Sequence, residues 1–136
     1  RTDSSAASDV YKRQDDGVVL LTGKVDNPQI RVEATRISWE PRGVIEVVNE
    51  IQVSEKSSIK DIAKDLAAST TIKGKLVADK NIKSVNFNID VVNGIAYLSG
   101  VARTQKEMNL VLAYTKETLY INQLVNYIQL SESLSQ

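Results

Sequence analysis

Two stretches of this 136-residue chain repeat each other at a constant offset. The segment DGVVLLTGKVDN at 16–27 matches NGIAYLSGVART at 93–104, and VVNEIQV at 47–53 matches LVNYIQL at 124–130. Both pairs of segments are separated by the same number of residues, with no insertion or deletion between them. This indicates that one structural unit is repeated in the chain. This repeat constrains the chain to two small copies of one fold.

The second copy contains a predicted β-hairpin. Residues 85–92 and 95–102 alternate apolar and polar side chains around an Asn-Gly pair at 93–94. Asn-Gly favours a two-residue hairpin turn, because both turn residues need a positive φ angle. Such a turn places Phe87 opposite Gly100 on the apolar face, which we expect to be the core face. A glycine in that row predicts either the close approach of a helix or a bulge in the strand.

A helix and a third strand follow the hairpin. Thr104 and Glu107 form a capping box for a predicted helix at 105–119. Asn27 occupies the same repeat position and, with a proline after it, caps a predicted helix at 28–39. Two different residue types therefore supply the same cap, and each copy closes with an alternating strand.

The N-terminal end of the chain does not follow the repeat. Residues 4–14, SSAASDVYKRQ, have neither a helical nor a strand period and resemble a translated sequencing-library adapter, which makes residues 1–14 the expected extent of the scar. We expect them to be a non-native scar outside the fold; the alternative is a native polar terminus. The second copy has helical sequence before its hairpin, at 57–69 and 69–84, whereas the equivalent helix of the first copy is absent upstream of residue 15. We therefore expect a truncated first copy whose strand at 18–25 has lost its hairpin partner.

These patterns predict an α+β fold of two repeats. The expected organisation is a scar at 1–14, a partial first domain (strand–helix–strand) at 15–53, a linker and helix at 54–68, a second domain at 69–130 and a polar tail at 131–136.

The second copy resembles the BON domain. The resemblance rests on IKGKLVADKNIKS at 72–84, VVNGIAYLSGVA at 91–102 and LVNYIQL at 124–130. Two such copies resemble the dual-BON periplasmic lipoproteins of Gram-negative bacteria. The resemblance implies α/β sandwiches of the order helix–strand–strand–helix–strand. It also implies a non-enzymatic role in membrane integrity or osmotic stress, in the periplasm and at the outer membrane, with the targeting segment missing from this fragment.

The resemblance further implies that the first helix of the second domain, about 67–79, binds anionic phospholipid. Two departures from the family pattern stand out. Ala67–Ser69 replace an aromatic residue that members often carry at the start of this helix. Tyr120-Ile121 replaces the usual Gly-Val before the last strand, which is present as Gly43-Val44 in the first copy.

Positive charge gathers around this helix. Residues 59–83 hold six lysines and three aspartates, in a chain with a net charge of zero. Each lysine near a membrane contributes about 1 kcal/mol of attraction to anionic lipid. The expected lipid-binding residues are Lys64, Thr70, Lys73, Val77 and Lys80. The alternative is an ordinary solvated helix face.

Other residues have weaker functional signals. Val92, Ile95 and Tyr97 lie together on the non-core face of the predicted hairpin, where they suit a protein contact or docking between the two domains. This surface supports the alternative function, a periplasmic protein-interaction module without lipid binding. We expect Trp39 to be half-buried at a helix end. Asn49 and Asn126, at equal repeat positions, are expected to satisfy backbone groups.

Composition argues against several functions. The chain has no cysteine or histidine, which removes thiolate nucleophiles, Cys/His zinc sites and imidazole acid–base chemistry. We find no nucleophile–base pair or phosphate-binding loop, and expect no enzyme activity, cofactor or metal. Without residues 1–14 the net charge is −1, which disfavours nucleic acid as a partner. No apolar run of about 18 residues is present.

Overall fold

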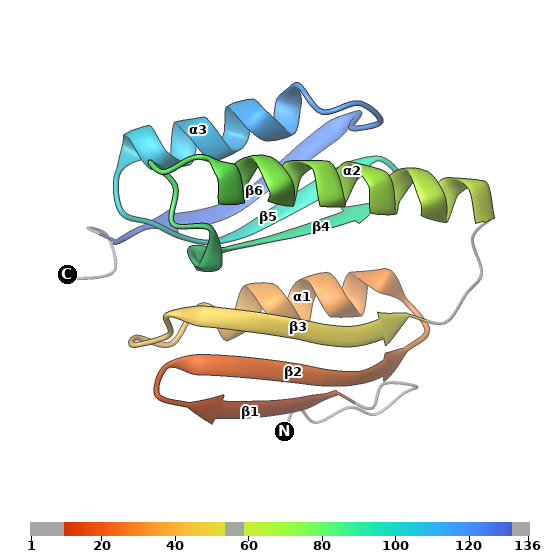
Figure 1. Ribbon diagram of the computed structural model, residues 1–136. Coiled ribbons are helices and arrows are strands. Elements are labelled where there is room, and N and C mark those ends of the chain that lie inside the picture. The colour runs from red at the N-terminus through yellow and green to blue at the C-terminus, as the bar shows by residue number, and fades with distance from the viewer. Residues whose placement is uncertain (1–9, 54–58, 132–136) are drawn as a thin grey trace. The chain divides into compact units, whose positions relative to one another are not determined.

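A computed structural model describes residues 10–53 and 59–131 (Figure 1). The chain divides into two compact units, with the boundary between residues 56 and 57. Each unit contains one three-stranded sheet and its own helices, which confirms an α+β fold of two repeats.

The first unit is a three-stranded sheet with one helix. Its elements are β1 (Tyr11–Asp15), β2 (Val18–Val25), α1 (Pro28–Ser38) and β3 (Glu46–Val53). β1 and β2 are antiparallel, and α1 connects the parallel pair β2 and β3. Trp39, which was expected to be half-buried, is only 2% exposed and belongs to the core of this unit.

β1 overturns two expectations about the N-terminal end. Tyr11–Asp15 pair with Val18–Thr22, so the strand at 18–25 has a hairpin partner. The turn between them, Asp16-Gly17, has φ angles of 51° and 84°, close to the 51° and 79° of Asn93-Gly94. Residues 10–14 therefore take part in the fold. Residues 1–9 lie outside the described part, and a non-native origin for 1–14 stays a prediction.

The second unit adds a long helix before the same arrangement. Its elements are α2 (Ile59–Ala78), the 3-10 turn η1 (Ser84–Asn86), β4 (Phe87–Val92), β5 (Ile95–Ala102), α3 (Gln105–Lys116) and β6 (Gln123–Leu130). α2 and α3 lie on the same face of the β4–β5–β6 sheet (Figure 1). The core between them includes Ile72, Leu76, Leu98 and Val111, which are all almost fully buried.

The hairpin has the predicted register, with Phe87 opposite Gly100 and Ile89 opposite Leu98. The strand begins later than predicted, because Val85 lies in η1 and is 46% exposed. Gly100 has a φ of 131°, and a Cβ there would lie 2.0 Å from the carbonyl oxygen of Asn86. The backbone entering β4 therefore occupies the space, so the expected helix approach is wrong, and the register continues without a bulge.

α2 is one continuous helix, whereas two helical segments meeting at residue 69 were expected. Ser69 is buried inside it, and its hydroxyl donates to the carbonyl oxygen of Leu66 at 3.1 Å instead of capping a new helix. The expected domain boundary between 68 and 69 therefore falls within α2. Among the described residues, no helix has the length and apolar character needed to cross a membrane.

Candidate functional site

The outward side of α2 presents apolar residues beside a lysine. Leu66 and Val77 are 64% and 72% exposed, and Thr70 and Lys73 between them are exposed as well. Spacings of four, three and four residues place these side chains along one side of a helix. We call Leu66, Thr70, Lys73 and Val77 the α2 outer surface. It contains three of the five predicted lipid-binding residues.

Leu66 was missed from the sequence, because the predicted break at residue 69 separated it from the other three residues. If one helix had been predicted through residue 69, its periodicity would have placed Leu66 on the same side as Lys73.

The two remaining predicted residues lie elsewhere. Lys64 is nine residues, or about two and a half turns, before Lys73, which places it on the opposite side of α2. Its ammonium nitrogen lies 5.6 Å from the centroid of the Tyr120 ring, within the range of a cation–π contact. Lys80 follows the end of α2 in an exposed turn. The structure therefore does not bring Lys64 together with Lys73.

Polar contacts fix the orientation of α2 on the sides away from the α2 outer surface. The Asp65 carboxylate accepts hydrogen bonds from the backbone N–H groups of Asn93 and Gly94, at 2.8 and 3.0 Å. Lys75 forms an ion pair with Glu117 at the end of α3, at 3.1 Å. Within 10–53 and 59–131, Lys73 and Lys80 have no acidic side chain at ion-pair distance. The charge of Lys73 and of Lys80 is therefore not taken up by an ion pair within these residues.

A shallow pocket of about 460 Å³ lies at the C-terminal end of α2. It is lined by Lys75, Ala78, Asp79, Lys80, Asn81 and Tyr114. The Tyr114 hydroxyl and the Asn81 backbone N–H donate to the Asp79 carboxylate, at 2.7 and 2.8 Å. The hydrogen bond from Tyr114, followed by that from Asn81, lowers the pKa of Asp79, so this carboxylate is ionised at neutral pH.

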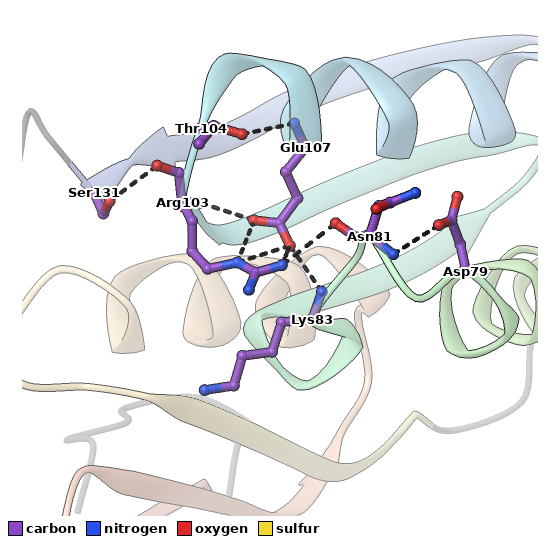
Figure 2. Close-up of polar contacts among 7 residues, drawn as sticks. All are labelled: Asp79, Asn81, Lys83, Arg103, Thr104, Glu107 and Ser131. Atoms are coloured by element: carbon purple, nitrogen blue, oxygen red, sulfur yellow. Dashed lines mark hydrogen bonds and ion pairs between the residues drawn. The ribbon is translucent and has the colours of Figure 1, made fainter.

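A buried carboxylate holds the segment that follows α2 (Figure 2). Glu107 is 3% exposed and accepts hydrogen bonds from the backbone N–H groups of Lys83 and Arg103, at 2.7 and 2.8 Å. The Arg103 guanidinium forms an ion pair with it at 2.7 Å and also donates to the Asn81 carbonyl oxygen at 3.3 Å. We call these contacts the Arg103–Glu107 clasp.

The predicted capping box is only half formed. The Thr104 hydroxyl oxygen accepts from the Glu107 N–H at 3.1 Å, as expected. The Glu107 carboxylate goes to Arg103 and Lys83 instead of the Thr104 N–H. Burial alone raises the pKa of Glu107, but the hydrogen bonds from Arg103 and Lys83 outweigh it and hold the pKa below its usual value. Lys83 is remote in sequence, so the helix-start pattern gave no signal of this contact.

The second predicted surface lies on the other side of the β4–β5 hairpin. Val92 pairs with Ile95, and Tyr97 pairs with Asp90, on the face opposite the buried Leu98. All three predicted contact residues are half-buried. The structure brings them together, so this surface stays the alternative site.

The paired asparagines satisfy backbone groups, as predicted. The Asn49 side-chain oxygen accepts from the Ile51 N–H at 3.0 Å, and that of Asn126 accepts from the Ile128 N–H at 2.9 Å. Among the described residues, no three His, Cys, Asp or Glu side chains cluster in a way that would hold a metal ion.

Comparison with known proteins places this architecture in a family. A family model described as "BON domain" matches residues 6–55 and 64–132. A protein of Anaplasma centrale, named only as an uncharacterized protein in the gshII 5' region, is 42% identical over 127 residues, which cover 93% of this chain and 84% of that protein.

Two relatives carry more informative names. The outer membrane lipoprotein DolP of Haemophilus influenzae is 37% identical over 93 residues, covering 68% of this chain and 48% of that protein. The osmotically-inducible protein Y of Escherichia coli is 29% identical over 107 residues, covering 77% of this chain and 53% of that protein. The chain thus spans about half the length of these two relatives.

Among solved structures, the chain is similar to the C-terminal domain of CdsD, a structural protein of the type III secretion system of Chlamydia trachomatis. That match has 15% identity and a TM-score of 0.42, and covers 84% of this chain and 52% of the other. This likeness is too low to carry an argument.

Proposed function

Because this chain belongs to the BON domain family, we propose that it is a non-enzymatic module of the bacterial envelope that binds anionic phospholipid membranes. The observation that carries the proposal is the α2 outer surface, where Leu66 and Val77 are exposed on either side of Lys73. Apolar contact combined with positive charge is what adsorption to an anionic lipid surface requires.

The names of the relatives support an envelope role. One is an outer membrane lipoprotein and another is osmotically inducible. We accordingly propose a periplasmic location near the outer membrane and a contribution to membrane integrity or osmotic tolerance.

The expected strength of this contact is modest. Lys73 and Lys80 contribute about 1 kcal/mol each near an anionic surface, and partial burial of Leu66 and Val77 adds about 3 kcal/mol together. A total of about 5 kcal/mol corresponds to a dissociation constant somewhat below 1 mM. Membrane binding should therefore be reversible and sensitive to salt.

Co-sedimentation with vesicles tests the proposal. The full chain is mixed with neutral vesicles or vesicles rich in phosphatidylglycerol, at low and moderate salt. We expect binding to the anionic vesicles alone, weakened by salt. Lys73→Glu should weaken it at least about tenfold, because charge reversal replaces attraction by repulsion. Val77→Ser should weaken it through lost apolar contact.

The matched control is Lys24→Glu, the same charge change at an exposed position of β2 in the first unit. This variant should bind like the unmodified chain. Equal binding to neutral vesicles, or binding that neither α2 variant alters, would contradict the proposal. A chain that binds no vesicle would shift the function to protein interaction through Val92, Ile95 and Tyr97.

A further inference from the structure

We propose that the outer edge of β6 is a pairing surface for β6 of a second copy of this chain, and that Asn126 keeps this edge closed by occupying one of its backbone donors. A strand at the edge of a sheet presents unpaired backbone groups to which another strand can bind. β6 lies at the edge of the β4–β5–β6 sheet, and the described residues add no strand beyond it. The kind of partner that fits this edge is therefore an extended strand.

β6 lacks the features that usually protect an edge strand. Its eight residues, QLVNYIQL, include no charged residue and no proline, and its pairing with β5 runs without a bulge. The equivalent edge strand of the first unit, β3, carries Glu46 and Glu50. Charged residues, prolines and bulges are common means by which sheets prevent edge-to-edge pairing. The outer edge of β6 therefore needs another means of protection.

Asn126 occupies a backbone donor at this outer edge. The Gln123 N–H bonds inward, to the carbonyl oxygen of Gly94 just before β5. Because successive N–H groups of a strand point to opposite edges, those of Leu124, Asn126 and Ile128 point outward. The Asn126 side-chain oxygen accepts from the outward Ile128 N–H at 2.9 Å. A strand arriving at this edge must therefore compete with Asn126 for the Ile128 N–H.

The first unit contains the same arrangement at the same repeat position. β3 is likewise an edge strand, and the Asn49 side-chain oxygen accepts from the Ile51 N–H at 3.0 Å. The Glu46 N–H bonds inward, so the Ile51 N–H, five residues later, points outward. The helix of each unit holds the nitrogen of its asparagine, through Thr35 in α1 and Met108 in α3. Two strands of different sequence thus keep the same acceptor on the same outward donor.

A second copy of β6 fits this edge when it runs antiparallel about Asn126. That register sets Leu124 opposite Ile128 on the core side of the sheet. On the other side it sets Val125 opposite Tyr127, so both pairs are apolar or aromatic and no like charges meet. Each Ile128 N–H would then donate to the Leu124 carbonyl oxygen of the other copy. Asn126 competes for both of these hydrogen bonds and so opposes the pairing directly.

Sedimentation velocity of the full chain, over a range of protein concentrations, tests the inference. We expect the unmodified chain to stay monomeric and Asn126→Ala to dimerise. Its association constant should be at least about tenfold higher, because each copy loses the hydrogen bond that competes with pairing. Asn126→Asp keeps the acceptor oxygen and should stay monomeric. The matched control, Gln123→Ala, removes an amide side chain from the same strand but leaves the outward donors unchanged, and should also stay monomeric.

Amide hydrogen exchange followed by NMR locates the contact. In the unmodified chain we expect slow exchange at Ile128, whose N–H is bonded to Asn126, and fast exchange at Leu124. In the Asn126→Ala dimer the Leu124 amide should become protected, while the amides of β4 and β5 keep their protection.

An Asn126→Ala chain that folds and stays monomeric would overturn the inference. So would a dimer in which Leu124 still exchanges fast, or an unmodified chain that already pairs through β6. Equal exchange rates at Ile128 and Leu124 in the unmodified chain would overturn the role of Asn126 even if the alanine variant does not fold.

Discussion

At the scale of single residues, Tyr120 shows that the repeat accepts a non-glycine residue at a position with a positive φ angle. Its φ angle is 75°, and the glycine at the same repeat position, Gly43, has a φ of 88°. A residue with a Cβ is disfavoured there by about 1–2 kcal/mol. The fold thus needs a left-handed residue before its last strand, and the second unit meets that need with a tyrosine whose ring contacts Lys64.

Comparing Tyr120→Gly with Tyr120→Ala isolates this backbone strain, since both variants remove the ring. We expect the glycine variant to be more stable by about 1 kcal/mol, because alanine keeps the unfavourable φ angle. The free energy of unfolding in urea measures the difference. An alanine variant at least as stable as the glycine variant would show that the backbone here is not strained.

At the scale of elements, the Arg103–Glu107 clasp joins the segment after α2 to the start of α3. Glu107 satisfies two backbone N–H groups from different parts of the chain and is itself buried. Its pKa is below its usual value, so the folded state favours the ionised form. The stabilisation is present above the unfolded-state pKa of about 4.3 and is lost as the pH falls through the lower pKa of the folded state.

We therefore expect the second unit to lose stability as the pH drops below about 4. Glu107→Gln should cost about 1–3 kcal/mol at pH 7, since it weakens hydrogen bonds to a charged group, and should flatten the pH dependence. Urea unfolding at pH 7 and pH 3.5 measures both effects.

Glu33→Gln is the control, because the Glu33–Arg36 pair is exposed and should contribute little. If the free energy of unfolding of the Glu107 variant depends on pH as strongly as that of the unmodified chain, the ionisation of Glu107 is not the cause of the acid destabilisation.

At the scale of the whole molecule, the two units have separate cores. Among the described residues, the buried core of the second unit runs from Ala68 to Ile128, and the partly buried Leu130 packs against it. Over residues 10–53 the first unit has three strands and one helix, and β2 lies between β1 and β3. A piece beginning at residue 15 loses β1 and exposes one edge of β2.

We expect residues 57–136 to fold alone and residues 15–56 to remain unfolded, because so small a fragment without β1 has too little core. Proton NMR of the two fragments checks this. We expect a dispersed spectrum from residues 57–136 and not from residues 15–56. A fragment of residues 1–56, which keeps β1, is the matched comparison and should be the more ordered of the two N-terminal pieces. Dispersed signals from 15–56 would mean that β2 and β3 suffice.

Features set by neighbours in the chain were predictable from the sequence. Alternation and Asn-Gly predicted the hairpin register, Asn27 and Thr104 predicted the helix caps, and the repeat predicted two units of one architecture. Each of these depends on residues a few positions apart, whose preferences for dihedral angles and hydrogen bonds are local. The failure at β1 had another source, because residues 11–14 were excluded by their resemblance to an adapter and not by their pairing ability.

Contacts between distant segments were decided by the tertiary structure alone. The side of α2 that carries Lys73 differs from the side that carries Lys64, and this followed only once the helix was continuous. Glu107 meets Lys83 across 24 residues of sequence, and Tyr114 meets Asp79 across 35. Local patterns determined which elements form, whereas the packing of those elements decided which charges are taken up by an ion pair and which are not.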